Sequence, residues 1–266
     1  GAMEDGKVKT FSRGGSDVTG SIVAKACRAD VYENWTDVSG FLVTDPRIVE
    51  NPEVIETITY RELRELSYMG ASVLHEEAIF PVKEKNIPIN ILNTNHPEEG
   101  GTIIVEKDDH PSEQMITGIA GKKNFTVIAI YKNHMSDEVG IIRRALEICE
   151  NYRISIEHIP SGIDSFSIVV NSEDVKDIIY DMVGDMKKAC NADEIKIIDN
   201  ISLIATVGRQ MMYRPGISGK LFAVLGKNNI NIRMIAQGTD EMNIIVGVEN
   251  NDYEKTVETI YNNFVV

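Results

Sequence analysis

The sequence has 266 residues, of which 42% are hydrophobic and 26% charged, an ordinary globular composition that fits one large domain or two to three small ones. No run of about 18 apolar residues occurs, and the first residues lack the basic-then-apolar pattern of a secretory signal, so we expect a cytoplasmic protein without a membrane span. Lys and Arg number 27 against 41 Asp and Glu, a net charge of −14. That field repels a polyanion and so argues against nucleic-acid binding, although a high net charge is also a common solubility device.

The cysteines and histidines suggest neither a disulfide framework nor a metal site. Cys27, Cys149 and Cys190 are odd in number, widely spaced and set in apolar helical patterns, which favours reduced thiols in the core. The five histidines are scattered along the chain, without the ligand spacing of a metal centre. No nucleophile–base pair has an interpretable spacing either.

Residues 1–107 alternate predicted strands and helices. The elements are, in chain order, a helix at 17–28, a strand at 30–35, helices at 59–69 and 72–86, and a strand at 88–92. Thr59 and Glu62 have the T-x-x-E spacing of a capping box at the start of the second helix. Strands that alternate with helices predict a mostly parallel sheet.

A polar segment at 108–117 is the predicted linker, and an internal repeat follows it. At a constant offset of 76 positions, residues of the first copy match residues of the second: Ile128 and Ile204, Ala129 and Ala205, Met135 and Met211, Gly140 and Gly216, Ile141 and Ile217, Ile154 and Ile230, Ile156 and Ile232. A gapless register of this length indicates a duplication, and we expect two units at 118–199 and 200–266.

Both copies show the same predicted order of strand, helix, strand, strand and helix. The first copy has these elements at 125–132, 139–152, 154–159, 165–171 and 173–189, and the second at 202–208, 215–228, 230–236, 242–248 and 252–264. This is the ferredoxin-like order, which a further strand at 194–198 would close. One copy of about 70 residues is small for an independent core, so we expect copies to pair side by side.

Two loops of the first 107 residues could bind a ligand. The segment Arg13-Gly14-Gly15-Ser16-Asp17 stands at a predicted helix start, where glycines and free N–H groups favour an anion; the alternative is a plain turn with Ser16 or Asp17 as N-cap. The segments 34–40 and 44–47 follow a strand of a predicted parallel sheet, which is where nucleotides bind in such folds; the alternative is a solvated loop.

Taken together, these segments resemble aspartokinases. The stretch T-F-S-R-G-G-S-D at 10–17 is similar to their G-R-G-G-S-D signature, with Ser12 where many members carry glycine. W-T-D-V-S-G at 35–40 with T-D-P-R at 44–47 resembles their nucleotide motif, and M-G-A-S-V-L-H at 69–75 and the tandem repeat complete the match. The resemblance implies an α/β and α+β architecture, in which part of an amino-acid-kinase three-layer sandwich precedes two ferredoxin-like ACT domains.

The resemblance also implies site residues in the first unit. Arg13, Ser16 and Asp17 would contact aspartate, and the nucleotide would be bound by Thr36, Asp37, Leu42, Arg47 and Ser72, the last a lysine in some relatives. The implied reaction transfers the γ-phosphoryl group of Mg-ATP to the β-carboxylate of aspartate, the first step towards lysine, threonine and methionine, and needs no prosthetic group. Nothing resembling the family's lysine–glycine phosphate strand occurs in the 266 residues, so we expect the isolated chain to be inactive.

ACT domains bind amino acids between paired copies, so the resemblance implies an effector site and a homodimer. The effector residues would be Met135, Ser136, Asp137, Val139, Gly140, Ile141, Ile142, Ser155, Ile156, Glu157 and Asp164. The acidic residues in and near this set, Glu138 included, favour lysine over threonine as the effector, because a carboxylate can bind an ammonium group. The alternative is that these acids are ordinary solvated charges that bind no ligand. The second copy carries basic residues at 209–214 instead, so we expect it to be structural or interface-forming, and relatives suggest that it is inserted within the first.

Three functions remain open on the sequence: an aspartate kinase with feedback regulation, a non-catalytic amino-acid-sensing regulatory subunit, and an adaptor without a ligand. The first is favoured because about a hundred kinase-like residues precede the repeat.

Overall fold

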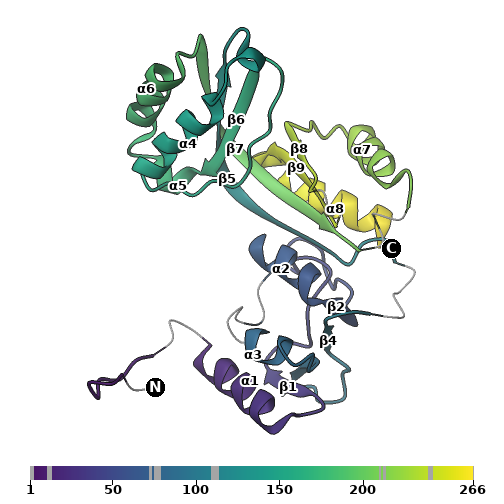
Figure 1. The fold of residues 1–266 in the computed structure, drawn as a ribbon. Helices are drawn as coiled ribbons and strands as arrows, with labels where there is room; N and C mark the ends of the chain where they lie inside the picture. The colour runs from purple at the N-terminus through teal and green to yellow at the C-terminus, as the bar shows by residue number, and fades with distance from the viewer. Residues whose placement is uncertain are drawn as a thin grey trace.

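The computed structural model of the protein describes residues 3–10, 14–71, 74, 79–108, 114–209, 211, 214–238 and 242–265. An N-terminal unit is built around a four-stranded sheet, and the C-terminal residues form a five-stranded sheet that carries helices (Figure 1). Among the described helices, none has the length and apolar character that crossing a bilayer requires.

The N-terminal unit has a mixed sheet flanked by helices. Its elements are α1 (Gly15–Cys27), β1 (Tyr32–Thr36), β2 (Thr57–Thr59), α2 (Tyr60–Tyr68), α3 (Ile79–Lys83), β3 (Ile89–Asn93) and β4 (Thr102–Val105). The strand order is β1-β3-β4-β2, with β1 parallel to β3 and β2 parallel to β4. The β3–β4 pair is antiparallel, so the expected parallel pairing holds for two of the three pairs, and the sequence did not predict β2 or β4.

The N-termini of α1 and α2 can be compared with the capping residues predicted from the sequence. The capping box is confirmed: the Thr59 hydroxyl accepts a hydrogen bond from the backbone N–H of Glu62, and the Glu62 carboxylate accepts one from the Thr59 N–H. The alternative that Ser16 or Asp17 caps α1 is wrong. Gly14 is the N-cap, with a φ of 64° that suits glycine, and no side chain caps the helix. Of the helix predicted at 72–86, the described residues form only α3.

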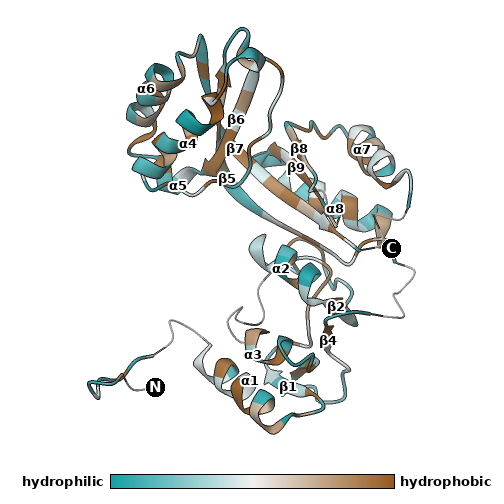
Figure 2. Cartoon of the chain, viewed as in Figure 1, coloured by the Kyte–Doolittle hydropathy of each residue, from teal (hydrophilic) through white to brown (hydrophobic). Residues whose placement is uncertain are grey.

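The repeat forms a single antiparallel sheet of order β6-β5-β7-β9-β8. The elements of this part are β5 (Gly118–Tyr131), α4 (Ile141–Asn151), β6 (Ser165–Asn171), α5 (Ser172–Val175), α6 (Ile179–Cys190), β7 (Glu194–Val207), α7 (Ile217–Lys227), β8 (Met234–Ala236), β9 (Asn243–Glu249) and α8 (Tyr253–Phe264), with short 3₁₀ turns η2 (Met135–Asp137) and η4 (Asn250–Asp252). Apolar residues predominate in the buried parts of these strands (Figure 2).

The two copies share one topology. Helices α4 and α7 both have 11 residues, their bounds differ by 76 positions (141 to 217 and 151 to 227), and each follows a glycine of positive φ, Gly140 at 83° and Gly216 at 91°. Two predictions for the first copy were wrong. Residues 154–159 form a loop bridged to β6 rather than a strand, and the helix expected at 173–189 is broken into α5 and α6.

The copies are joined through β5 and β7, which run through both. The first half of β5 pairs with the second half of β7, from Gly118 opposite Val207 to Lys122 opposite Leu203; the second half of β5 pairs with the first half of β7. The boundary expected at 199/200 therefore lies inside β7. The order of insertion is the reverse of the one expected: the first copy interrupts the second, because residues 118–122 supply the strand that completes the second copy.

Two hydrophobic cores result. One lies under α4 and α6 and belongs to the first copy; the other is continuous from the N-terminal unit into the second copy. The end of the predicted linker belongs to this second core, since Ile116 is buried and the Thr117 N–H donates to the Val207 carbonyl at 2.7 Å. Cys149 and Cys190 are buried as expected, but Cys27 at the end of α1 is exposed.

Candidate functional site

The loop after β1 begins at the carboxyl end of the four-stranded sheet. Thr36 and Asn93 are the last residues of the parallel strands β1 and β3 and lie opposite each other. The Thr94 N–H donates to the Thr36 carbonyl at 2.8 Å, and the Asn93 amide donates to the Ser39 hydroxyl at 2.8 Å. The loop that starts at Asp37 is therefore fixed at the edge where parallel sheets bind ligands.

A buried threonine holds the middle of this loop. The Thr102 hydroxyl accepts a hydrogen bond from the Phe41 N–H at 2.8 Å and donates one to the Ile55 carbonyl at 2.6 Å. Gly40 has a φ of 106°, and a Cβ there would come within 2.4 Å of the Thr102 hydroxyl. Position 40 therefore requires glycine for its backbone conformation and for space.

Arg47 is bound to its own loop. Its guanidinium forms a bidentate ion pair with Asp45, at 3.0 Å from Nε to Oδ1 and 2.6 Å from Nη2 to Oδ2. The hydrogen bond from Arg47 holds the pKa of the Asp45 carboxyl below its ordinary value. The side chain of Arg47 is 88% exposed, so a ligand could take over the guanidinium without a change in the fold.

This loop forms one side of a cavity of about 900 Å³ between the N-terminal unit and the second copy. Three of the five residues predicted to bind nucleotide line it: Asp37, Leu42 and Arg47. Met69, Gly70 and Ala71 close the end of α2, and Ile119 to Gly121, Lys123, Tyr253, Glu254 and Val257 form the opposite side. Thr36 lies directly before the lining residues, and Ser72 is outside the described part of the chain.

Two of the three residues predicted to bind aspartate, Ser16 and Asp17, lie outside the lining of this cavity. Arg13 is outside the described residues, and Ser16 and Asp17 belong to the first turn of α1. The Asp17 carboxylate accepts from the Asn34 amide at 3.3 Å, and its carbonyl accepts from the Tyr32 hydroxyl at 3.1 Å. These bonds tie the start of α1 to β1, but neither Ser16 nor Asp17 lines the cavity.

The predicted effector residues gather at the start of α4 and in the loop beside β6. Met135 is buried, Ile141 is buried and Ile142 is half-buried, whereas Ser136, Asp137, Val139, Ser155 and Asp164 are exposed. Gly140 is the N-cap of the 11-residue helix α4, and a side chain placed there would meet nothing within 4 Å. The helix start with its N–H groups is thus open to an anion.

Two of the acids counted for this site already have partners. Glu138 bridges Lys132, at 3.1 Å, and Arg144, and the hydrogen bond from Lys132 lowers the pKa of its carboxyl. Glu157 accepts a hydrogen bond from the Tyr68 hydroxyl at 2.7 Å. The acidity that favoured lysine as effector is therefore smaller than the sequence indicated, and Asp137 and Asp164 carry most of it.

The side of α2 that faces the repeat contacts both copies. Besides the Tyr68–Glu157 bond, the Asn243 amide of β9 donates to Glu65 at 2.5 Å, and Arg209 after β7 forms an ion pair with Glu62 at 2.7 Å. The Glu62 side chain is fully buried. Burial alone would raise its pKa, but hydrogen bonds from Thr117 and Thr59 and the charge of Arg209 outweigh burial and lower it.

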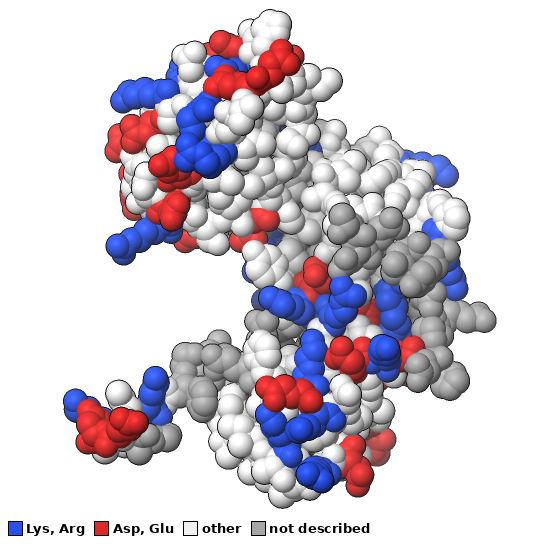
Figure 3. Space-filling view, in the orientation of Figure 1, with Lys and Arg blue, Asp and Glu red and all other residues white. Residues whose placement is uncertain are grey.

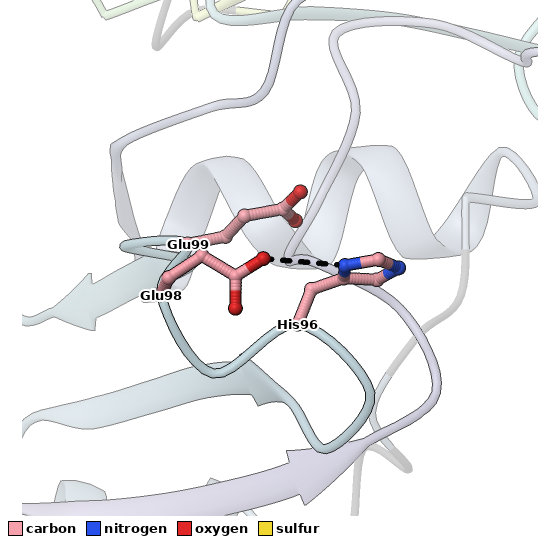
Figure 4. Close-up of side chains that lie close together, drawn as sticks. All are labelled: His96, Glu98 and Glu99. Carbon is pink, nitrogen blue, oxygen red and sulfur yellow. Dashed lines mark hydrogen bonds and ion pairs between the residues drawn. The ribbon is translucent and has the colours of Figure 1, made fainter.

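Sequence reasoning missed several residues of these sites. Lys123, Tyr253 and Glu254 could not be associated with the loop at 37–48, because they are at least 75 residues away in sequence and only the tertiary fold brings them together. His96, Glu98 and Glu99 were also missed: within the described residues their ligand atoms lie within 4.8 Å of one another (Figure 4). All three are exposed, and exposed acidic groups are common without an ion, so we assign no metal to them.

Comparisons with known proteins agree with this geometry. A family model described as the amino acid kinase family matches residues 1–93, and one described as an ACT domain matches residues 204–264. Aspartokinase 3 of Bacillus subtilis is 40% identical over 265 residues, which are 99% of this chain and 58% of that protein. The chain thus spans less than two thirds of the length of this relative.

The chain is also similar to solved structures of aspartate kinases. The aspartate kinase of Clostridium acetobutylicum, described as an allosteric enzyme, is 57% identical, with a TM-score of 0.93 over 99% of this chain and 61% of that one. Escherichia coli aspartokinase III is 26% identical with a TM-score of 0.78, both in complex with aspartate and ADP and in complex with lysine and aspartate.

Proposed function

Because this chain belongs to the aspartokinase family, we propose that it carries the nucleotide-binding and effector-binding parts of an aspartate kinase, which phosphorylates the β-carboxylate of aspartate with Mg-ATP. The observation that carries the proposal is the cavity at the carboxyl end of β1, lined by Asp37, Leu42 and Arg47. The related E. coli enzyme has been solved with ADP and aspartate, which supports a nucleotide of this class.

Aspartate binding is assigned to Arg13, Ser16 and Asp17. The location of Ser16 and Asp17 at the start of α1, bonded to β1, supports a site at the same end of the sheet as the loop. Ser72 and Thr36 complete the proposed nucleotide set. The reaction needs positioning and charge neutralisation more than a protein nucleophile, and magnesium would neutralise the phosphates.

The ACT copies are proposed to bind an amino-acid effector and to pair in a homodimer. The open helix start at Gly140 suits an α-carboxylate, and the exposed carboxylates of Asp137 and Asp164 suit an ammonium group. Lysine is the proposed effector, with threonine as the alternative. The E. coli enzyme, solved with lysine, supports this choice.

Calorimetric titration of the chain with lysine, threonine and Mg-ADP tests these assignments. We expect lysine to bind more tightly than threonine, Asp164→Ala to weaken lysine binding, and the matched exposed variant Asp177→Ala to leave it unchanged. Lysine binding that is the same in Asp164→Ala would remove Asp164 from the site. Binding of an effector should also raise the melting temperature with concentration.

We expect the 266 residues alone not to phosphorylate aspartate, because no lysine–glycine strand of the kind that holds the transferred phosphate occurs in them. A coupled assay that gave turnover comparable to a complete relative would contradict this. The second candidate function, a non-catalytic sensing subunit, predicts effector binding without nucleotide binding, so the Mg-ADP titration separates the two.

A further inference from the structure

The cavity between the N-terminal unit and the second copy has two sides of different origin. One side is the loop at 37–48, which the proposed function assigns to the nucleotide. The other is formed by β5 and by the first turn of α8, which belong to the repeat (Figure 1). A ligand in the cavity would therefore contact both parts of the chain at once.

Cations are scarce in this cavity. Among the described residues that line it, Arg47 and Lys123 carry the positive charges, while Asp37, Asp45 and Glu254 carry negative ones. A nucleoside polyphosphate needs cations as partners. Acidic groups outnumber basic groups in the lining, whereas Lys and Arg are interspersed with Asp and Glu on the visible surface of the N-terminal unit (Figure 3).

The two cations are held in the same way on opposite sides. Arg47 pairs with Asp45, two residues before it in the loop, and Lys123 pairs with Glu254 in the first turn of α8. The ammonium group of Lys123 also lies 5.0 Å from the centre of the Tyr253 ring. Each cation is therefore already in position and partly neutralised by one carboxylate that an incoming phosphate could replace.

A distortion of β5 fixes Lys123 in this position. The pairing register of β5 with β7 shifts between Lys122 and Phe125, and Asn124 has a φ of 67°. The Asn250 amide donates to the Asn124 side-chain oxygen at 2.8 Å, which joins the distortion to the turn before α8. Tyr253 is buried and donates to the Gly121 carbonyl at 2.8 Å, so the support beneath Lys123 is rigid.

We propose that Lys123, a residue of the regulatory repeat, is a second cation for the phosphates of the bound nucleotide, opposite Arg47. This inference rests on the proposed nucleotide site and adds a contact to it. Glu254 holds the ammonium group when the cavity is empty and competes with the phosphates for it. Since β5 continues from Lys123 through the first copy to Tyr131, before the effector loop, the same strand connects both sites.

The test measures the affinity of the 266-residue chain for a fluorescent ADP derivative with magnesium. Lys123→Met should weaken binding about fivefold, as expected for one partly exposed charge pair. Glu254→Gln should have the opposite effect and tighten binding, because it removes the competing carboxylate. Lys196→Met is the matched control: Lys196 also lies 5.0 Å from a tyrosine ring and 3.5 Å from a glutamate, but it is in the first copy, outside the lining of the cavity.

The outcomes separate the inference from the proposed function. Wild-type affinity in Lys123→Met would overturn the inference alone. Weaker binding in both Lys123→Met and Glu254→Gln would also overturn it. That result would mean that the Lys123–Glu254 ion pair only stabilises the wall of the cavity, since either substitution breaks this pair. If the wild-type chain does not bind the ADP derivative, the nucleotide site itself is wrong and the inference with it. Melting temperatures of the three variants show that each is folded.

Discussion

Replacing Glu62 with alanine should destabilise the protein strongly, because this carboxylate joins three segments in the interior. Glu62 is fully buried and accepts hydrogen bonds from the Thr59 hydroxyl at 2.7 Å, the Thr117 hydroxyl at 2.5 Å and the Arg209 guanidinium at 2.7 Å. These donors belong to the start of α2, the segment before β5 and the loop after β7.

The expected loss of stability in Glu62→Ala follows from the groups that would remain in the interior without Glu62 as their partner. Removing one member of a buried ion pair costs about 3–5 kcal/mol, since the other charge remains without compensation. Arg209 also pairs with Asp108, which reduces the loss. The Thr59 N–H loses its bond to the Glu62 carboxylate as well, whereas the Thr59 hydroxyl still accepts from the backbone N–H at position 62. We therefore expect Glu62→Ala to lower the free energy of unfolding by about 3 kcal/mol.

Urea unfolding followed by the fluorescence of Trp35 measures this loss. Trp35 is the single tryptophan and lies in β1, so it reports on the N-terminal unit. Glu173→Ala is the control, because its ion pair with Lys176 is exposed and should be worth less than about 1 kcal/mol. If Glu62→Ala and Glu173→Ala lower the free energy of unfolding equally, the buried network does not hold these segments together.

Three further outcomes follow from single positions. The folded-state pKa of Glu62 is below its ordinary value, so its contribution to stability is present above the unfolded-state pKa and is lost as the pH falls through the folded-state pKa. The acid limb of the stability curve should therefore be shallower in Glu62→Ala. Gly101→Ala should lower the melting temperature markedly, because φ is 69° and a Cβ would lie 1.9 Å from a backbone carbonyl oxygen; normal stability would show that this turn can relax. With a thiol reagent, exposed Cys27 should react quickly and buried Cys149 and Cys190 only on unfolding, and burial, which raises the pKa of Cys149 to about 11, adds to its protection. Rapid labelling of all three thiols in the folded state would contradict the packing of α4 and α6.

Local signals in the sequence predicted the parts of the fold that depend on neighbouring residues. The T-x-x-E spacing gave the capping box of α2 because both partners lie within one helical turn. The offset of 76 residues predicted equivalent helices in the two copies, and α4 and α7 have the same length and bounds that differ by 76 positions. Both helices begin after a glycine and have the same apolar spacing. The order of residues after β1 likewise indicated a ligand loop at the end of a strand.

Contacts between distant segments could not be predicted in this way. The strands β2 and β4 are only three and four residues long and carry no periodic signal of their own. They form because β2 pairs with β4 and β4 pairs with β3. The negative charges near the first copy suggested a site for a cation, but Lys132 and Arg144 neutralise Glu138 through the fold.

The sequence by itself determined the family, the duplication and the position of a candidate ligand loop after β1, because these depend on motifs and spacings that are local in the chain. Only the tertiary structure decided that β5 and β7 run through both copies, that the first copy interrupts the second, and that Lys123 and Glu254 face Arg47 and Asp45 across one cavity. The physical reason is that strand pairing and ion pairing act over a few ångströms in space, whatever the separation in sequence.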